Sequence, residues 1–112
     1  MLKKEYRIKK NKEFQIVYKK GKVFHSPSVV MYIYNNTGQK SRFGFTVSKK
    51  IGKAVIRNKI KRKLREICRL NLHKIKKGYD IIIVARIAIK EKTYQEIAKD
   101  VLRLFHKAKV LQ

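Results

Sequence analysis

The stretch from residue 48 to residue 72, SKKIGKAVIRNKIKRKLREICRLNL, decides how this chain is organised. Apolar side chains recur along it at Ile56, Ile60, Leu64 and Ile67. Their spacing of three or four positions predicts an amphipathic helix whose apolar stripe packs on a core. A single acid, Glu66, stands among the basic residues, which are Lys49, Lys50, Lys53, Arg57, Lys59, Lys61, Arg62, Lys63, Arg65 and Arg69.

The face opposite the apolar stripe is predicted to bind a polyanion. At about 100° per residue, this face carries Arg57, Asn58, Lys61, Arg62, Arg65 and Arg69. Basic residues on a helix often do no more than interact with solvent, but solvated faces usually mix the two signs of charge. Because this face does not mix them, we favour a polyanionic partner over a merely solvated surface.

The composition of the whole chain points the same way. The chain has 112 residues, with 31 Lys and Arg against 7 Asp and Glu, which gives a formal net charge of +24. This length predicts a single domain, residues 1–112, with a modest core. So large an excess of one charge is typical of proteins that bind a polyanion. No acid lies between Glu13 and Glu66, so the central half of the chain is expected to meet phosphates.

Other classes of protein are disfavoured. The single cysteine, Cys68, excludes an intramolecular disulfide and a zinc site built from cysteines, and its place beside Ile67 predicts a thiol in the core. The sequence has no apolar run of membrane-spanning length and no signal-peptide core at its N-terminus. We therefore expect a cytoplasmic protein that does not bind membranes.

The chain before the basic helix is expected to form one helix and three strands. Asn11 is predicted to cap a helix over residues 12–20, which ends at Gly21. On that helix Phe14 and Tyr18 share a side, a pairing that more often packs in a core than contacts a ligand. The predicted strands cover residues 23–25, 29–34 and 42–48. Turn residues at 35–38 predict that the second and third strands pair as an antiparallel hairpin.

One more strand and one more helix are expected after the basic helix. A nearly continuous β-branched run over residues 79–89 predicts a strand that is buried on both faces. Thr93 is predicted to cap the last helix, with Glu96 at the capping-box position. The apolar stripe of this helix is Ile97, Val101, Leu104 and Phe105. The order α-β-β-β-α-β-α predicts an α+β fold, a small α/β sandwich with helices packed on a mainly antiparallel sheet.

No catalytic or metal-binding constellation is evident. His25, His73 and His106 are dispersed along the chain, without the spacing of metal ligands. The carboxylates form no pair suited to acid–base catalysis, and the glycines form no phosphate-binding loop. We therefore expect no catalytic residue and no metal ligand in this chain. A nuclease with its own active site stays open as an alternative.

The central segment SRFGFTVSKKIGKAVIRNKIKRKLRE resembles the signature of the protein subunit of bacterial ribonuclease P. The family's Arg-Asn-Arg motif is present as Arg57-Asn58-Lys59, in which Lys59 keeps the charge of an arginine but not its bidentate geometry. The resemblance continues in RIKKNKEFQIVYKKGK, which is similar to the family's first helix, in YDIIIVAR, its last strand, and in TYQEIAKDVLRLF, its last helix. It therefore covers nearly the whole chain.

The resemblance implies a role in an endoribonuclease in which an RNA subunit does the chemistry. That RNA uses Mg²⁺ to hydrolyse the phosphodiester at the 5′ end of mature tRNA. The protein would bind the catalytic RNA and the single-stranded 5′ leader of precursor tRNA, with one copy of the chain per RNA and self-association left open. A left-handed β-α-β crossover around the basic helix is also implied, whereas general handedness rules favour a right-handed one.

The resemblance also assigns residues by position. Leader contacts fall to Phe14, Tyr18 and Tyr32, so a stacking role now displaces core packing as the better interpretation of these rings. Contacts to the catalytic RNA, from the matched positions and from the charges that flank them, are Lys49, Lys50, Lys53, Arg57, Asn58, Lys61, Arg62, Arg65 and Arg69. Other non-enzymatic interpretations are a structural rRNA-binding protein and a DNA-binding protein. Aromatic side chains among basic ones favour RNA, because unpaired bases stack on aromatic rings.

Overall fold

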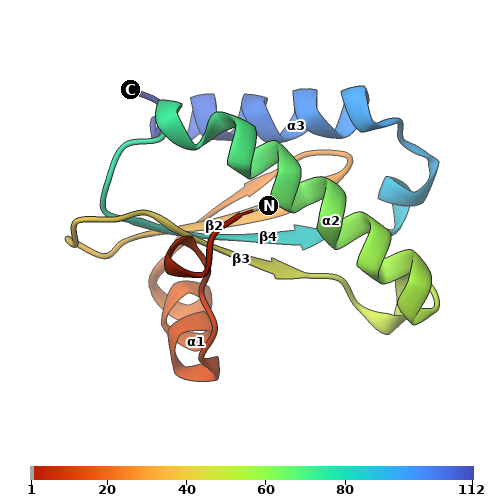
Figure 1. The fold of residues 1–112 in the computed structure, drawn as a ribbon, viewed down its shortest axis with the longest axis horizontal. Helices are drawn as coiled ribbons and strands as arrows, with labels where there is room; N and C mark the ends of the chain where they lie inside the picture. The colour runs from red at the N-terminus through yellow and green to blue at the C-terminus, as the bar shows by residue number, and fades with distance from the viewer. Residues whose placement is uncertain (1) are drawn as a thin grey trace.

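A four-stranded sheet divides the helices into two groups (Figure 1), as seen in a computed structural model that describes residues 2–112. The strands are β1 (Lys22–His25), β2 (Val29–Asn35), β3 (Arg42–Thr46) and β4 (Tyr79–Ala85). The helices are α1 (Asn11–Lys20), α2 (Ala54–Asn71) and α3 (Tyr94–Lys107). Helices α2 and α3 cover one face of the sheet and α1 covers the other. This arrangement confirms the predicted element order and the α+β class.

The order of the strands corrects the predicted hairpin. The sheet runs β1-β2-β4-β3, with β4 antiparallel to β2 and parallel to β3. The strands β2 and β3 therefore do not pair with each other. The consecutive isoleucines Ile81, Ile82 and Ile83 of β4 are each 0% exposed. A strand that is apolar on both faces is buried most fully between two neighbours. Strand β4 therefore lies between β2 and β3, which the predicted hairpin would have paired directly.

Helix α2 is the crossover that connects the parallel strands β3 and β4. In Figure 1, β3 and β4 run to the right with α2 above them, and β3 lies nearer to the viewer than β4. The crossover is therefore left-handed, as the resemblance implied. Because most β-α-β connections are right-handed, no general rule would have predicted this feature.

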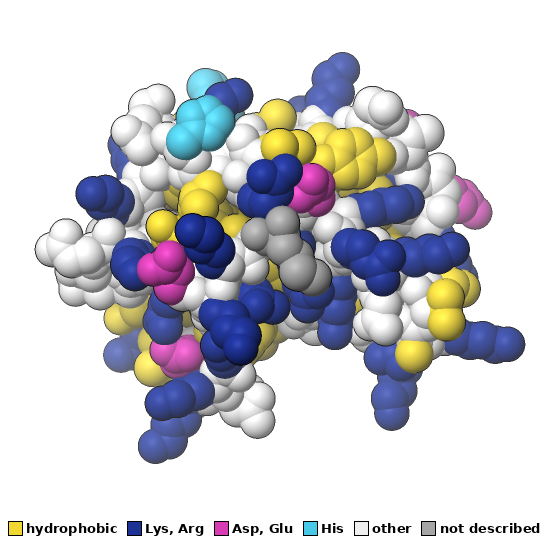
Figure 2. Space-filling model, viewed as in Figure 1, with side chains coloured by type: hydrophobic (Ala, Val, Ile, Leu, Met, Phe, Trp, Pro, Cys, Tyr) yellow, Lys and Arg dark blue, Asp and Glu magenta, His cyan; other side chains and the backbone are white. Residues whose placement is uncertain are grey.

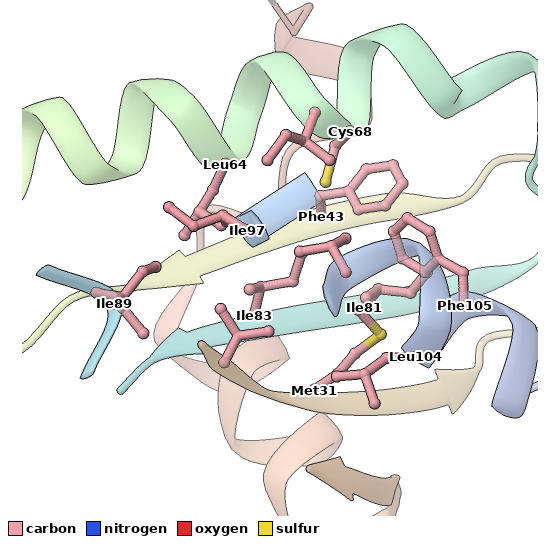
Figure 3. Close-up of a cluster of buried hydrophobic side chains, with 14 of the residues drawn as sticks. Met31, Phe43, Leu64, Cys68, Ile81, Ile83, Ile89, Ile97, Leu104 and Phe105 are labelled. Atoms are coloured by element: carbon pink, nitrogen blue, oxygen red, sulfur yellow. The ribbon is translucent and has the colours of Figure 1, made fainter. Parts of the chain in front are cut away.

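The main core lies between the sheet and helices α2 and α3 (Figure 3). Buried side chains in it include Met31, Phe43, Leu64, Ile81, Ile83, Ile97, Leu104 and Phe105. The predicted stripe of α2 is correct from Ile60 onward, but Ile56 is 39% exposed and covers Gly52 instead of entering the core. Cys68 is in the core as predicted, and burial raises the pKa of its thiol.

The predicted helix and strand ends needed smaller corrections. Helix α1 begins one residue earlier than predicted, with Lys10 rather than Asn11 in the capping position. Strand β4 ends at Ala85, because a 3₁₀ turn over Ile87–Glu91 follows it. The capping box of α3 is confirmed: the Glu96 N–H donates to Thr93 Oγ1 at 3.1 Å, and the Thr93 N–H donates to Glu96 Oε1 at 2.9 Å. Within the part of the chain described, no helix is long and apolar enough to cross a membrane.

An ion-pair network centred on Arg42 fastens α1 to the sheet. The Arg42 guanidinium donates to both carboxylate oxygens of Asp80 on β4, at 3.0 and 2.8 Å, and also to the Glu13 carboxylate on α1. The Asn36 side-chain amide donates to Asp80 at 2.7 Å. The Arg42 guanidinium also lowers the pKa of Glu13. One side chain of β3 therefore ties the neighbouring strand and the first helix together.

Arg42→Ala is expected to lower the free energy of unfolding by about 2 kcal/mol. Breaking a buried pair costs about 3–5 kcal/mol. We expect less because the Arg42 side chain is 30% exposed, although that of Asp80 is only 6% exposed. Urea denaturation gives the change directly. Arg103→Ala, an exposed arginine on α3, is the control and should change stability by no more than about 0.5 kcal/mol. Equal losses in the two variants would contradict a structural role for the network.

Candidate nucleic-acid interface

Three aromatic side chains meet on the α1 face of the sheet. Phe14 and Tyr18 come from α1 and Tyr32 comes from β2. The ring centroids of Phe14 and Tyr18 are 6.3 Å apart, and those of Tyr18 and Tyr32 are 4.9 Å apart in an edge-on arrangement at 86°. All three residues are half-buried. We call these three residues the aromatic platform; they are the residues to which the family resemblance assigned the leader contacts.

A second, smaller apolar cluster supports the platform. Its buried members are Ile8, Val17 and Ile82. Val17 is 0% exposed and lies between Phe14 and Tyr18 in the sequence, so the inner side of α1 anchors the rings. The Tyr18 hydroxyl and Thr46 Oγ1 are 2.9 Å apart and form a hydrogen bond, which fixes the second ring against β3. The platform is therefore held from both α1 and the sheet.

Gly44 on β3 makes room for the ring of Phe14. A Cβ atom at Gly44 would lie 2.8 Å from two carbons of that ring, closer than van der Waals contact allows. A glycine inside a strand often marks such a close approach. The glycine inside this strand therefore indicates a close approach, but the sequence did not show which side chain makes it.

A small groove connects the platform to helix α2. It has a volume of about 150 Å³ and is lined by Arg7, Ile8, Lys9, Phe14, Phe43, Gly44, Phe45 and Arg65. We call it the junction groove. Among the residues described, no partner accepts a hydrogen bond from the Nε of Arg7 or of Arg65, although both atoms are buried. The guanidinium groups of Arg7 and Arg65 also line the groove, and their positive charge suits an anionic oxygen. Sequence reasoning did not select Arg7, because a lone arginine in a basic segment carries no signal.

The basic residues of α2 fall into two sets. Arg57, Lys61 and Arg65 are spaced by four and are half-buried along the flank that reaches the junction groove. Asn58 and Arg62 are exposed on the outer surface. Figure 2 shows Lys and Arg side chains crowding this side of the molecule. Of the nine residues predicted to contact RNA, these five lie nearest to one another along the helix.

The other four predicted RNA contacts are more dispersed. Lys49 and Lys50 lie in the 3₁₀ turn Lys49–Ile51, and Lys53 is the capping residue of α2; all three are exposed. Arg69 donates two hydrogen bonds to Glu66, at 2.7 and 2.9 Å, so a neighbouring carboxylate already matches its charge. On the half-buried flank, the Arg57 Nε donates to the Gly52 carbonyl at 3.1 Å, which leaves the rest of its guanidinium for other partners.

The few acids of the chain mostly have internal partners. Glu5 pairs with Lys40, Glu13 and Asp80 with Arg42, and Glu66 with Arg69; Glu96 belongs to the α3 capping box, and Asp100 accepts a hydrogen bond from Ser28. The carboxylates thus serve to join elements of the fold. Most lysines and arginines are left to face outward, which suits a phosphate-rich partner.

The described residues show no obvious catalytic centre. His25, His73 and His106 are all exposed and lie on different elements. Within residues 2–112, no group of three His, Cys, Asp or Glu side chains could hold a metal ion. The aromatic faces and guanidinium groups of this surface suit unpaired bases and phosphates.

Comparison with known proteins shows the family of this chain. A model of the family described as Ribonuclease P matches residues 2–109. The chain belongs to the ribonuclease P protein family. The Ribonuclease P protein component of Clostridium kluyveri is 49% identical over 105 residues, covering 92% of this chain and 94% of that protein. That of Alkaliphilus metalliredigens is 44% identical over 105 residues, with coverages of 94% and 95%.

Solved structures of ribonuclease P proteins have the same fold. The Staphylococcus aureus RNase P protein aligns with a TM-score of 0.88 at 42% identity, over 96% of this chain and 98% of that one. The Thermotoga maritima RNase P protein aligns with a TM-score of 0.80 at 32% identity, over 88% and 93%. This chain is accordingly the protein subunit of an endoribonuclease that processes the 5′ ends of tRNA.

The packing of Phe14 against Gly44 can be tested with a double-mutant cycle. Gly44→Ala is expected to lower the free energy of unfolding by about 1–3 kcal/mol, because the added methyl group overlaps the ring. In a Phe14→Ala background the same substitution should cost much less, since the ring is gone. Urea denaturation of the four proteins measures the coupling. An equal cost in both backgrounds would show that Gly44 does not serve Phe14.

Proposed function

We propose that this chain binds the 5′ leader of precursor tRNA on the aromatic platform while α2 binds the catalytic RNA. The observation that carries the proposal is the junction groove, which joins Phe14 of the platform to Arg65 of the basic helix. A single strand crossing the platform would reach the groove next, where the guanidinium groups of Arg7 and Arg65 line the wall and can bind a phosphate. The leader and the catalytic RNA would thus be held on adjoining surfaces.

The platform suits a leader whose sequence differs from one precursor to the next. Every base offers a flat face, so stacking on aromatic rings tolerates changes of sequence and is worth about 1–3 kcal/mol per base. The platform rings are held by the sheet and α1, so little side-chain freedom is lost on binding. Lysines near the platform, including Lys9 in the junction groove and the exposed Lys19, would attract the phosphates of the strand.

Helix α2 would hold the catalytic RNA through its outer surface and its half-buried flank. The proposed contacts are Arg57, Asn58, Lys61, Arg62 and Arg65, with Lys49, Lys50 and Lys53 extending the surface beyond the N-terminal end of the helix. Arg69 is expected to contribute least, because its guanidinium is paired with Glu66. Arg65 is the residue that both surfaces share.

The bond-breaking step would belong to the RNA. In this proposal Mg²⁺ is held by the catalytic RNA, and the protein supplies position and charge: the platform orients the leader, and α2 offsets the repulsion between two polyanions. We propose one copy of the chain per RNA, acting in the cytoplasm. The protein alone is then expected to leave precursor tRNA uncut.

Tyr32→Ala should weaken holoenzyme binding of precursor tRNA by about 5- to 150-fold and leave binding of leaderless tRNA unchanged, because the stacking surface contacts only the leader. Dissociation constants are measured with Ca²⁺ in place of Mg²⁺ so that cleavage is slow. Tyr6→Ala, which removes a half-buried tyrosine packed on the main core, is the matched control and should affect both RNAs equally or not at all. Equal losses for both RNAs with Tyr32→Ala would remove the platform from leader binding.

A further inference from the structure

A second groove lies between helices α2 and α3; it shares Arg62 and Arg65 with the proposed RNA-binding surface, but the proposed function uses none of its other lining residues. Its volume is about 480 Å³, and it is lined by Lys59, Arg62, Lys63, Arg65, Glu66 and Tyr94. Because α2 and α3 cover the sheet face opposite α1, the Tyr94 side of this groove is remote from the aromatic platform. We call it the helix groove. Its size falls within the range of about 300–1,000 Å³ that is usual for sites that enclose a small molecule.

Tyr94 is positioned firmly in this groove. It is the first residue of α3, directly after the capping residue Thr93, whose reciprocal hydrogen bonds with Glu96 fix the start of the helix. The side chain is half-buried and packs on the main core. A ring that is held in this way can receive a flat partner with little loss of side-chain freedom.

The charges around Tyr94 favour an anionic partner. Lys59 and Lys63 are exposed one turn apart on α2, and Arg62 lies between them in the sequence. The only acid in the groove, Glu66, is held by Arg69 through two hydrogen bonds, which lower the pKa of Glu66 and offset its charge. The groove therefore combines one aromatic side chain with several unmatched cations.

We propose that the helix groove binds an unpaired nucleotide of the catalytic RNA, with the base against Tyr94 and the phosphates against Lys59 and Lys63. The inference rests on the proposed function, because it assumes that α2 faces that RNA. An aromatic face beside cations is the arrangement that recognises unpaired nucleotides, whereas the faces of paired bases are stacked inside a helical duplex. The catalytic RNA is favoured over the leader as the occupant, because Tyr94 lies on the α3 side of the sheet and the leader's platform lies on the α1 side.

The test uses two substitutions of Tyr94 in the full-length protein, with the cognate catalytic RNA as the probe. Tyr94→Leu keeps an apolar contact with the core but removes the ring, and should weaken RNA binding about tenfold. The dependence of log Kd on log salt should keep its slope, because stacking releases no counter-ions. Tyr94→Phe keeps the stacking face and should bind like the wild-type protein.

A lysine pair provides the complementary measurement. Lys59→Ala combined with Lys63→Ala should reduce the salt slope by about 0.7–0.9 for each phosphate that the variant no longer neutralises. Discrimination between precursor and leaderless tRNA should stay unchanged in every one of these variants. Thermal denaturation confirms that Tyr94→Leu is folded at the temperature of the assay.

Photocrosslinking of the wild-type holoenzyme keeps the test decisive even if Tyr94→Leu is unstable. With 4-thiouridine in the catalytic RNA, the tryptic peptide 93–99 that contains Tyr94 should be crosslinked. The proposal is overturned if Tyr94→Leu binds the RNA as tightly as wild type, or if the catalytic RNA binds but does not crosslink to this peptide. Wild-type protein that failed to bind the catalytic RNA at all would instead overturn the proposed function.

Discussion

The interaction on which the arrangement of this protein depends is the bridge that Arg42 makes between Asp80 and Glu13. Strands β3 and β4 are joined in sequence by α2, and the Arg42 bridge adds α1 to the same pair of strands. The aromatic platform and the basic helix are therefore both positioned by one rigid pair. Without the bridge, α1 would depend on the small cluster around Val17 and on the Tyr18–Thr46 hydrogen bond, and the platform would be held less firmly beside the junction groove.

Most carboxylates of the chain connect separate elements of the fold, and this explains the distribution of charge. Seven acids are too few to neutralise 31 basic residues, and most of the acids join separate elements of the fold. The outward cations then repel one another, which is unfavourable in the isolated protein and favourable once phosphates arrive. Binding of RNA and stabilisation of the fold are thus expected to be linked, because a partner that binds only the folded state stabilises it.

Patterns among neighbouring residues predicted the helices and strands of this fold, but they could not predict which strands pair with each other. The stripe from Ile60 to Ile67 and the Thr93–Glu96 capping box were correct, since both depend on neighbours within one turn of a helix. The hairpin of β2 and β3 was wrong, because the strand that separates them lies more than thirty residues later in the sequence. The platform was assigned only through the family resemblance. Arg7 and Tyr94 were missed, since their surroundings are made by elements distant in the chain.

The central claim is that α1 faces the leader while α2 faces the catalytic RNA. Site-specific crosslinking tests it directly, because the only native cysteine, Cys68, is buried with a raised thiol pKa and should escape labelling. Gln15→Cys places a photoreactive group beside Phe14 on α1, and Val55→Cys places one at a residue that is 67% exposed on α2. In the holoenzyme with precursor tRNA, the Gln15 probe should label the 5′ leader and the Val55 probe the catalytic RNA. Labelling of the leader from position 55 and of the catalytic RNA alone from position 15 would contradict the account.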